Sequence, residues 1–299
     1  MSFTRLAGFF LPISAILVVM AIIGFIWPGP KLSIEFTGGT LLEVELPEGT
    51  TREQLESSLA TVRFGDLPLT DVDLSRTRTG TYFVRLQTIT TEEHALLLTT
   101  LTRDLGNIQE LQYTTIGPTV GASLKIRALY ALLAALVAIV LYVASAFRKI
   151  PSNFSPWSFG VATIIALIHD ITIILGIFTI LSYYTTFQMD TLFVSALLSI
   201  MGYSVSDTIV IFDRIRDNLF AEGKRADFTD VAERSLRQSL TRTLNTGLGA
   251  LIMLFALFFF GSESIRWFIL ALIVGTLVGT YSSFFIATPL LTLWRKSRS

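Results

Sequence analysis

The chain has 299 residues, no net formal charge and no cysteine. Hydrophobic residues make up 52% of it and charged residues only 15%, with a mean hydropathy of +0.62. Soluble globular proteins average about 25% charged residues, so this composition argues against an ordinary soluble protein. The lack of cysteine excludes a disulfide framework and a cysteine-ligated metal site.

Apolar runs of roughly 18 residues or more predict transmembrane helices. We expect six, at residues 6–27, 128–147, 158–181, 191–212, 243–260 and 266–290. The first run is longer than the apolar core of a signal peptide, which has about 7–15 residues. The segment Trp27-Pro28-Gly29-Pro30 is also a poor cleavage site. We therefore expect residues 1–27 to form a cytoplasmic N-terminus and a retained first span.

Charge is distributed unevenly along the chain. Residues 31–120 carry 7 Lys and Arg against 13 Asp and Glu, a net charge of −6, so the remainder carries +6. Lys and Arg gather after the second, fourth and sixth spans. The positive-inside bias then places both termini in the cytoplasm and residues 28–125 on the external, periplasmic side.

The segment 28–125 is long enough for an independent domain. Thr51, with Gln54 three residues later, has the spacing of a capping box at a helix start. The expected elements are a strand at 33–36 and 40–46 broken by two glycines, a helix at 51–61, a hairpin at 71–77 and 81–87, a helix from 90 or 91 to 105, and a strand at 107–116. This β-α-β-β-α-β order predicts an α+β, ferredoxin-like fold.

The external domain offers little that resembles catalysis. His94 stands beside Glu92 and Glu93 in the first turn of the second helix. Because the usual cluster of His, Cys and carboxylate ligands is missing, we interpret this triplet as a solvated helix face and not as a metal site. A small domain without a site is more suited to contacting a partner or a polypeptide.

The third span carries two adjacent ionisable residues near its middle, His169 and Asp170. Neighbouring residues point about 100° apart on a helix, so at least one should lie against another span. A structural hydrogen bond inside the bundle and a proton relay are both compatible with this pair.

The fourth span carries a carboxylate, Asp207, about one and a half turns before its cytoplasmic end. A charged side chain at that depth is costly and is rare without a role or a partner. The alternative is a helix-end residue whose side chain reaches the interface. Small and polar residues at helical spacing predict one polar face that avoids lipid: Ser195, Ser199, Gly202, Tyr203, Ser206 and Asp207.

The fifth span begins with a second polar face, formed by Arg242, Asn245, Thr246 and Gly249. Because the chain returns to the same side of the membrane, Arg242 and Asp207 could lie at similar depth. We predict that they pair in at least one state. An ordinary positive flank that extends to the interface is the alternative for Arg242.

Two other cytoplasmic and membrane segments carry recognisable patterns. The loop 213–241 predicts an amphipathic helix on the cytoplasmic membrane surface, with a Glu233–Arg237 pair at i,i+4. Acids and bases interleave there, which argues against nucleic-acid binding. In the sixth span, Gly275 and Gly279 have the small-xxx-small spacing that lets helices approach closely.

Four motifs together resemble the SecF family, the smaller half of the SecDF protein-export factor in the RND superfamily. They are Phe36-Thr37-Gly38-Gly39-Thr40, Ile116-Gly117-Pro118-Thr119-Val120-Gly121, His169-Asp170 and the segment from Gly202-Tyr203-Ser204-Val205-Ser206-Asp207 through Arg216. The resemblance extends over nearly the whole chain. One departure is Ser206, where family members usually carry Asn.

The resemblance implies an RND-type half of six transmembrane helices, with residues 126–299 forming spans two to six, and a ferredoxin-like external domain. It implies a separate SecD chain as partner, because no SecD sequence is fused here. It also implies work beside the SecYEG channel in the bacterial cytoplasmic membrane, on unfolded preprotein. Membrane lipid and other Sec accessory membrane proteins are further expected partners.

By the same resemblance, the family's membrane-embedded carboxylate falls on Asp207 and its partner arginine on Arg242. The chain would then use the proton-motive force to drive late steps of preprotein translocation, not as an enzyme. The sequence has no Gly-rich phosphate-binding loop, and we expect no cofactor or metal. The alternatives are an RND-type exporter half for small molecules or lipids, and a structural brace for SecD.

Overall fold

The computed structural model describes residues 3–65, 67–70, 72–148, 156–223 and 227–296, and the chain divides into two compact units. The first contains residues 1–30, 130–181 and 191–299, and the second contains residues 31–129 and 182–190. The expected first hairpin residue, Asp71, lies outside the described residues.

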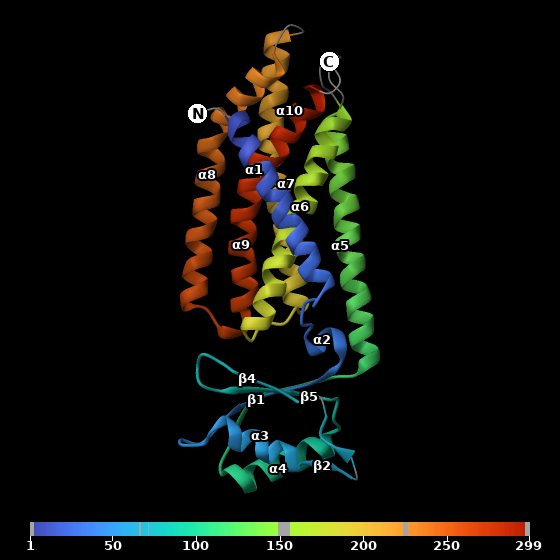
Figure 1. Ribbon diagram of the computed structural model, residues 1–299, viewed down its shortest axis with the longest axis vertical. Coiled ribbons are helices and arrows are strands. Elements are labelled where there is room, and N and C mark those ends of the chain that lie inside the picture. Colours follow the sequence, from blue (N-terminus) through green and yellow to red (C-terminus); the bar gives the residue numbers. More distant parts are fainter. Residues whose placement is uncertain (1–2, 66, 71, 149–155, 224–226, 297–299) are drawn as a thin grey trace. The chain divides into compact units, whose positions relative to one another are not determined.

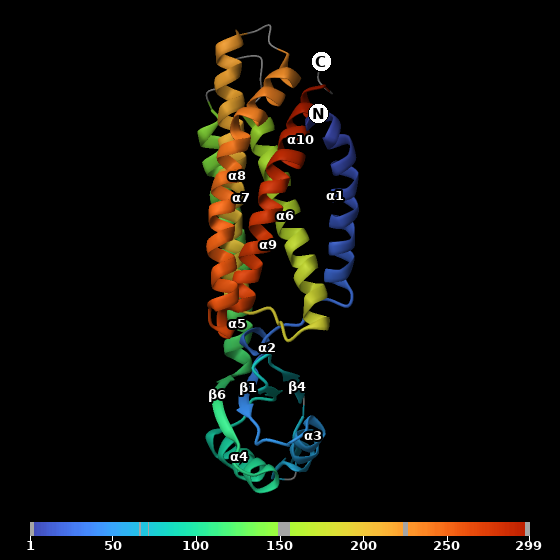
Figure 2. The same cartoon turned by 90° about the vertical axis from the view of Figure 1, so that its left-hand side faces the viewer.

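The prediction of six spans is confirmed in the described part of the chain, where six helices are long and apolar enough to cross a membrane. These are α1 (Phe3–Ile26), α5 (Pro118–Ala146), α6 (Pro156–Tyr184), α7 (Thr191–Glu222), α8 (Phe228–Phe260) and the series η2 (Glu263–Ile265), α9 (Arg266–Ser282), η3 (Ser283–Ala287) and α10 (Thr288–Lys296). Within the helical unit they run alongside one another (Figures 1 and 2).

The helical unit has an inner and an outer set of helices. In the most apolar windows of α6, α7 and the final series, 50–56% of the residues are buried, against 6–11% in α1, α5 and α8. Phe159 of α6 and Phe212 of α7 pack with each other and with Phe147, which directly follows α5, and the ring centroids lie 5.3–6.1 Å apart. The outer helices leave much of their apolar surface free, as expected for surfaces that meet lipid or another chain.

The sixth span contains a short π-helix, η3, directly after α9. At its end, the side-chain hydroxyl of Thr288 donates to the Ser283 carbonyl five residues earlier at 3.1 Å. Single-turn π segments inside α-helices occur frequently at functional sites. Here the π turn begins at Ser283, directly after Ser282, whose hydroxyl donates to the buried Asp170.

The expected amphipathic helix in 213–241 exists, but its predicted place on the membrane surface is wrong. It forms the first turns of α8, and α7 continues beyond the membrane segment to Glu222. Val231 and Leu236 are 0% and 1% exposed and belong to the same buried cluster as Leu219 of α7. The apolar face therefore packs against protein, while the predicted Glu233–Arg237 pair is present at 3.0 Å.

The second unit has the predicted ferredoxin-like order. Its four-stranded antiparallel sheet runs β4-β5-β1-β6, from β4 (Asp73–Arg76), β5 (Tyr82–Leu86), β1 (Gly39–Glu45) and β6 (Gln109–Ile116). Helices α3 (Arg52–Thr61) and α4 (Thr91–Leu105) supply core leucines to one face of the sheet. A two-stranded hairpin, β2 (Arg63–Phe64) and β3 (Leu67–Pro68), is added after α3.

Helices α3 and α4 start where the sequence predicted. Thr51 with Gln54 and Thr90 with Glu93 form complete capping boxes. The strand expected at 33–36 is wrong, because Ile34–Thr37 forms a helical turn, α2. The Ser33 hydroxyl accepts the Glu35 N–H at 3.2 Å and so stabilises the turn.

The interpretation of His94 as a solvated residue is also wrong. Its Nε2 lies 3.0 Å from a Glu110 carboxylate oxygen of β6, and its ring stacks on Tyr113 with centroids 3.8 Å apart. The side chain is only 16% exposed. This position of α4 therefore faces the sheet and not the solvent.

Candidate functional site

Asp207 of α7 is a buried carboxylate in a membrane-spanning helix. It is 5% exposed, and the Thr280 hydroxyl of α9 donates to its Oδ2 at 3.4 Å. Tyr203, one turn earlier on α7, places its hydroxyl 3.5 Å from the same threonine oxygen. Both contacts are long for hydroxyl hydrogen bonds, so Asp207 is held loosely.

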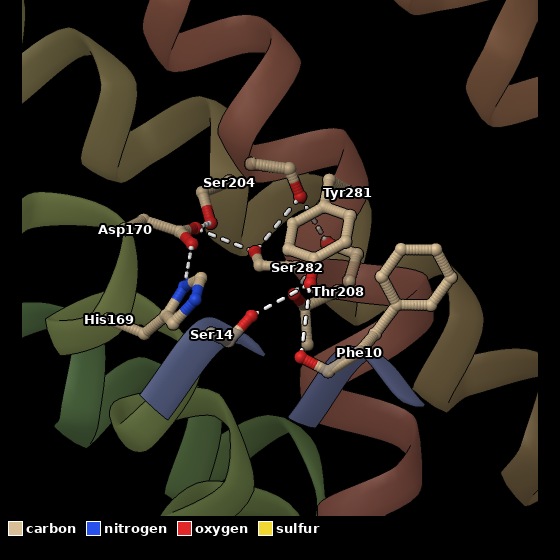
Figure 3. Close-up of polar contacts among 10 residues, drawn as sticks. Phe10, Ser14, His169, Asp170, Ser204, Thr208, Tyr281 and Ser282 are labelled. Carbon is tan, nitrogen blue, oxygen red and sulfur yellow. Dashed lines mark hydrogen bonds and ion pairs between the residues drawn. The ribbon is translucent and has the colours of Figure 1, made fainter. Parts of the chain in front are cut away.

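Asp170 of α6 has a much tighter environment. It is 0% exposed, and its carboxylate receives short hydrogen bonds from Ser204 at 2.5 Å and from Ser282 at 2.8 Å. The Nδ1 atom of His169 lies 2.9 Å from the other carboxylate oxygen (Figure 3). Asp170 therefore connects α6, α7 and α9 through hydrogen bonds in the centre of the bundle.

The His169 ring also has an unpartnered polar atom. Its Nε2 is buried and has no hydrogen-bond partner within the described part of the chain. The ring lies near Tyr281, with centroids 6.3 Å apart. The Tyr281 hydroxyl lies 2.7 Å from the Ser14 hydroxyl of α1 and donates to the Phe10 carbonyl at 3.5 Å (Figure 3).

The carboxylates of Asp207 and Asp170 accept hydrogen bonds from nearby positions of the same helix, α9. Asp207 contacts Thr280 and Asp170 contacts Ser282, two residues further along α9. The next residue, Ser283, lies 2.9 Å from the Thr208 hydroxyl of α7. A movement of α9 relative to α7 would therefore change the surroundings of both carboxylates.

The structure does not bring Arg242 to Asp207. The Arg242 side chain is exposed, and no ion pair involves it among the residues that the structure describes. Asn245, Thr246 and Gly249 are exposed beside it, so the expected polar face of α8 is present on the surface of the helical unit. The predicted pairing of Asp207 with Arg242 remains a prediction for another state.

The polar face expected on α7 divides into two environments. Asp207 and Tyr203 turn toward α9, but the smaller residues are exposed in this chain: Ser195, Ser199, Gly202 and Ser206. Two of these serines are satisfied within the helix, since Ser195 and Ser199 each donate to the carbonyl four residues earlier at 2.9 Å. Exposed small and polar positions of this kind suit a close helix–helix contact.

Gly275 and Gly279 lie where α9 approaches α7 most tightly. A Cβ atom added at Gly275 would overlap the Ile200 side chain, and one added at Gly279 would lie 3.1 Å from the Ser204 Cβ. The second glycine therefore sets how closely α9 approaches the serine that donates to Asp170.

Sequence reasoning missed Ser204, Thr280 and Ser282 as site residues. Serine and threonine are ordinary in transmembrane helices, where they bond to their own backbone, so their presence alone carried no signal. A usable signal was their position: Ser204 precedes Asp207 by one turn, and the serines at 282 and 283 follow the small-residue motif.

The motifs at Phe36–Thr40 and Ile116–Gly121 come together in the second unit. Gly38 has φ of +77°, and an added Cβ would lie 2.8 Å from the Pro118 Cα. At Gly121, an added Cβ would lie 2.7 Å from the Gly38 backbone nitrogen. Phe36 and Thr40 are buried and Thr37 is exposed. The two motifs thus form a close backbone contact that joins the start of β1 to the start of α5.

Metal ligands are not grouped in the part of the chain that the structure describes: no three His, Cys, Asp or Glu residues lie close enough to hold an ion. The buried polar groups are instead serine, threonine and tyrosine hydroxyls arranged around two carboxylates and one imidazole. Such groups can exchange protons and hydrogen bonds.

Comparisons with known proteins give a consistent family. A family model described as protein export membrane protein SecD/SecF, C-terminal, matches residues 97–297. A relative from Thermobaculum terrenum is 36% identical over 94% of this chain and 90% of its own, and one from Desulfurispirillum indicum is 38% identical over 98% and 91%. Both are named protein translocase subunit SecF.

Solved structures of SecDF also match the chain. SecDF from Thermus thermophilus, described as a translocon-associated membrane protein, matches with a TM-score of 0.86 and 31% identity over 99% of this chain. A SecDF structure described as a Super-membrane-facing form matches with a TM-score of 0.70 and 30% identity over 100% of this chain. The chain spans 39% of each of these SecDF chains.

Proposed function

The chain belongs to the SecF family of protein translocase subunits, and from that premise we propose that it couples the proton-motive force to late steps of preprotein translocation. A separate SecD chain is the proposed partner, and the SecYEG channel, unfolded preprotein and membrane lipid are its proposed surroundings. The proposed location is the bacterial cytoplasmic membrane, with both termini cytoplasmic and residues 28–125 external. Its energy source is the proton gradient, without a cofactor.

The observation that carries this proposal is the loosely held carboxylate of Asp207. It is 5% exposed in an apolar helix, and within the described residues its partners are two neutral hydroxyls, those of Thr280 and Tyr203, and no cation. A structural carboxylate would be expected to have partners as close as those of Asp170. A carboxylate that changes partners is suited to taking up and releasing protons.

The proposed cycle has two states of Asp207. In one state Arg242 pairs with the charged carboxylate. In the other state Arg242 is exposed and apart from Asp207, as in this structure, and Asp207 carries the proton. One charge moved across about 100 mV is worth about 2.3 kcal/mol, enough for a few protons to drive a conformational change. One of the two matching SecDF structures is described as a Super-membrane-facing form, which is consistent with more than one state of this fold.

His169 and Asp170 are the proposed second part of the proton path. The buried Nε2 of His169 is free of partners among the described residues, and the ring contacts Asp170, whose serine partners come from α7 and α9. A proton that reaches this ring could therefore alter the packing of the same helices that surround Asp207.

The deciding experiment compares Asp207→Asn with Asp213→Asn in membrane vesicles that contain the partner SecD chain and the channel. Asp213 lies on the same helix and is 48% exposed, so it is the matched control. We expect Asp207→Asn to abolish proton-gradient-stimulated completion of translocation while the complex still assembles, and Asp213→Asn to retain it.

Persistent stimulation with Asp207→Asn would overturn the proposal and would favour a structural role of this chain beside SecD. The same vesicles should then be tested with Asp170→Asn, because Asp170 is the other buried carboxylate among the described residues of the bundle.

A further inference from the structure

A cavity of about 470 Å³ lies in the second unit, where the start of β1 meets the end of β5. Its volume is within the range of about 300–1,000 Å³ that is usual for ligand sites. Apolar walls come from Leu32, Ile34 and Pro118, and the backbone of Gly38 and Gly39 closes one side. The Asp207 proposal makes no use of this cavity.

Arg85 places a largely buried cation in the wall of the cavity. It alternates along β5 with the core residues Val84 and Leu86, so it projects from the sheet face that α3 and α4 leave uncovered. Its side chain is only 12% exposed. Burial lowers the pKa of Arg85, and this effect is larger than the opposite effect of the nearby Asp73 carboxylate, which raises the pKa.

The partners of Arg85 leave part of its hydrogen-bonding capacity free. Nη1 donates to the Ser75 hydroxyl at 2.7 Å and reaches Asp73 at 3.5 Å, and Nη2 reaches the Thr186 carbonyl at 3.5 Å. Asp73 is 53% exposed, so its charge is largely solvated. A guanidinium has five N–H donors, so at least two remain for a ligand.

Gln188 adds a neutral polar group to the same cavity. Its side chain is half-buried, and within the described residues its amide makes no hydrogen bond. An amide offers both a donor and an acceptor, which is what a peptide group requires. The loop that carries it is fixed to this unit, since Ser33 donates to the Met189 carbonyl and Met189 donates to the Lys31 carbonyl, both at 2.9 Å.

We propose that this cavity binds a carboxylate on an extended polypeptide segment, with Arg85 holding the carboxylate and Gln188 holding an adjoining peptide group. A guanidinium fork matches a carboxylate through two parallel hydrogen bonds. The apolar walls of the cavity accommodate the side chains of the bound polypeptide that flank the carboxylate. This proposal rests on the proposed function only because that function brings an unfolded polypeptide to the external domain. It does not require proton coupling.

The test uses the full chain in lipid nanodiscs and three pentapeptide probes, measured by calorimetry without a proton gradient. The probes are acetyl-Ala-Leu-Glu-Leu-Ala-amide, its Gln counterpart, and the Gln peptide with a free C-terminal carboxylate. We expect the Glu probe to bind about tenfold tighter than the Gln amide, as a charged hydrogen bond predicts. The third probe shows whether a terminal carboxylate serves as well as a side chain.

Variants identify the site. Arg85→Gln should remove the preference for Glu, and Arg85→Lys should lose most of it because the fork is lost. Arg76→Gln is the matched control, since Arg76 is exposed on the adjacent strand and lies outside the cavity lining. Asp73→Asn should tighten the Glu probe several-fold, because it removes a competing carboxylate.

Equal binding of the Glu and Gln probes, or an unchanged preference in Arg85→Gln, overturns the proposal. Tighter Arg85-dependent binding of inorganic phosphate than of either carboxylate probe also overturns it, in favour of a general anion site. If Arg85→Gln fails to fold, the Asp73→Asn and Arg85→Lys results decide. Because this binding test uses no proton gradient, a negative result would not affect the interpretation of the Asp207→Asn experiment.

Discussion

At the residue scale, Gly275 determines how closely two inner helices pack. Because a Cβ at this position would overlap Ile200, we expect Gly275→Ala to lower the free energy of unfolding by about 1–3 kcal/mol through overpacking. Thermal unfolding of the purified chain in detergent measures this. Gly160→Ala is the control, since nothing lies within 4 Å of its added Cβ. An equal effect of both substitutions would contradict the packing argument.

The two buried carboxylates should differ in their contribution to stability. Asp170→Ala leaves the Ser204 hydroxyl and the His169 Nδ1 atom without their partner, whereas the Ser282 hydroxyl keeps the Gly279 carbonyl at 3.1 Å; each unsatisfied buried group costs about 1–3 kcal/mol. We expect a loss of about 3 kcal/mol or more in unfolding free energy. Asp207→Asn should change stability by less than about 1 kcal/mol, because the amide oxygen of Asn can still accept the long hydrogen bond from Thr280. The reverse order would argue that Asp207 is the structural residue.

Sequence reasoning could find the carboxylates but not their partners. Asp170 and Asp207 are conspicuous because acids are rare in apolar runs. Ser204 and Ser282 are not, since their hydrogen bonds depend on how α6, α7 and α9 cross. The exposure of Arg242 is also a property of packing, and no spacing in the sequence distinguishes a paired from an unpaired edge arginine.

At the element scale, the hairpin of α7 and α8 should behave as a packed structure. Leu236 is 1% exposed in the cluster that includes Ile215 and Leu219. We expect Leu236→Ala to cost about 2–5 kcal/mol of unfolding free energy, as large-to-small core substitutions do. Leu244→Ala is the control, because Leu244 is 43% exposed on the same helix. No loss for Leu236→Ala would restore the membrane-surface interpretation.

The start of α4 should be sensitive to acid. The backbone N–H of the first turn and the Thr90 hydroxyl hold the pKa of Glu92 below its usual range. A lowered folded-state pKa gives stability above the unfolded value, near pH 4.3, which is lost as the pH falls through the folded value. The protection of α4 amides from hydrogen exchange, relative to the intrinsic rate at each pH, should therefore fall below about pH 4.3 in the full chain, and Glu92→Gln should flatten this dependence.

Elements with local signals were predictable. The two capping boxes start α3 and α4 because their hydrogen bonds lie within four residues. The turn at Ile34–Thr37 was missed because its four residues alternate like a strand while Ser33 provides a cap. The continuation of α8 from residue 228 was missed because hydropathy marks only its apolar part.

At the scale of the whole molecule, the polar faces of α7 and α8 predict the partner surface. The cysteine-free chain permits a clean test with Thr246→Cys. We expect maleimide labelling at this position to fall when the SecD chain is present. Leu133→Cys on α5 is the control, because Leu133 is 49% exposed on a helix without such a polar face and should label equally in both cases. Equal labelling at Thr246→Cys would remove this face as the interface.

The overall plan of the molecule was largely readable from sequence, since six apolar runs and a β-α-β-β-α-β pattern are strong periodic signals. The assignment of residues 182–190 to the sheet-containing unit was not readable. It depends on backbone hydrogen bonds between Met189 and the Lys31–Ser33 segment, which leave no mark on composition.

The π turn at Ser283–Ala287 changes the helical phase of the sixth span. A π turn takes up about one residue more than an α turn, and each residue corresponds to about 100° of rotation. The residues of α10 (Thr288–Lys296) therefore face a direction about 100° away from that of an unbroken helix. Deleting one residue within the turn would restore the regular phase. It would leave Ser282 opposite Asp170, but it would rotate the whole of α10 to a new face.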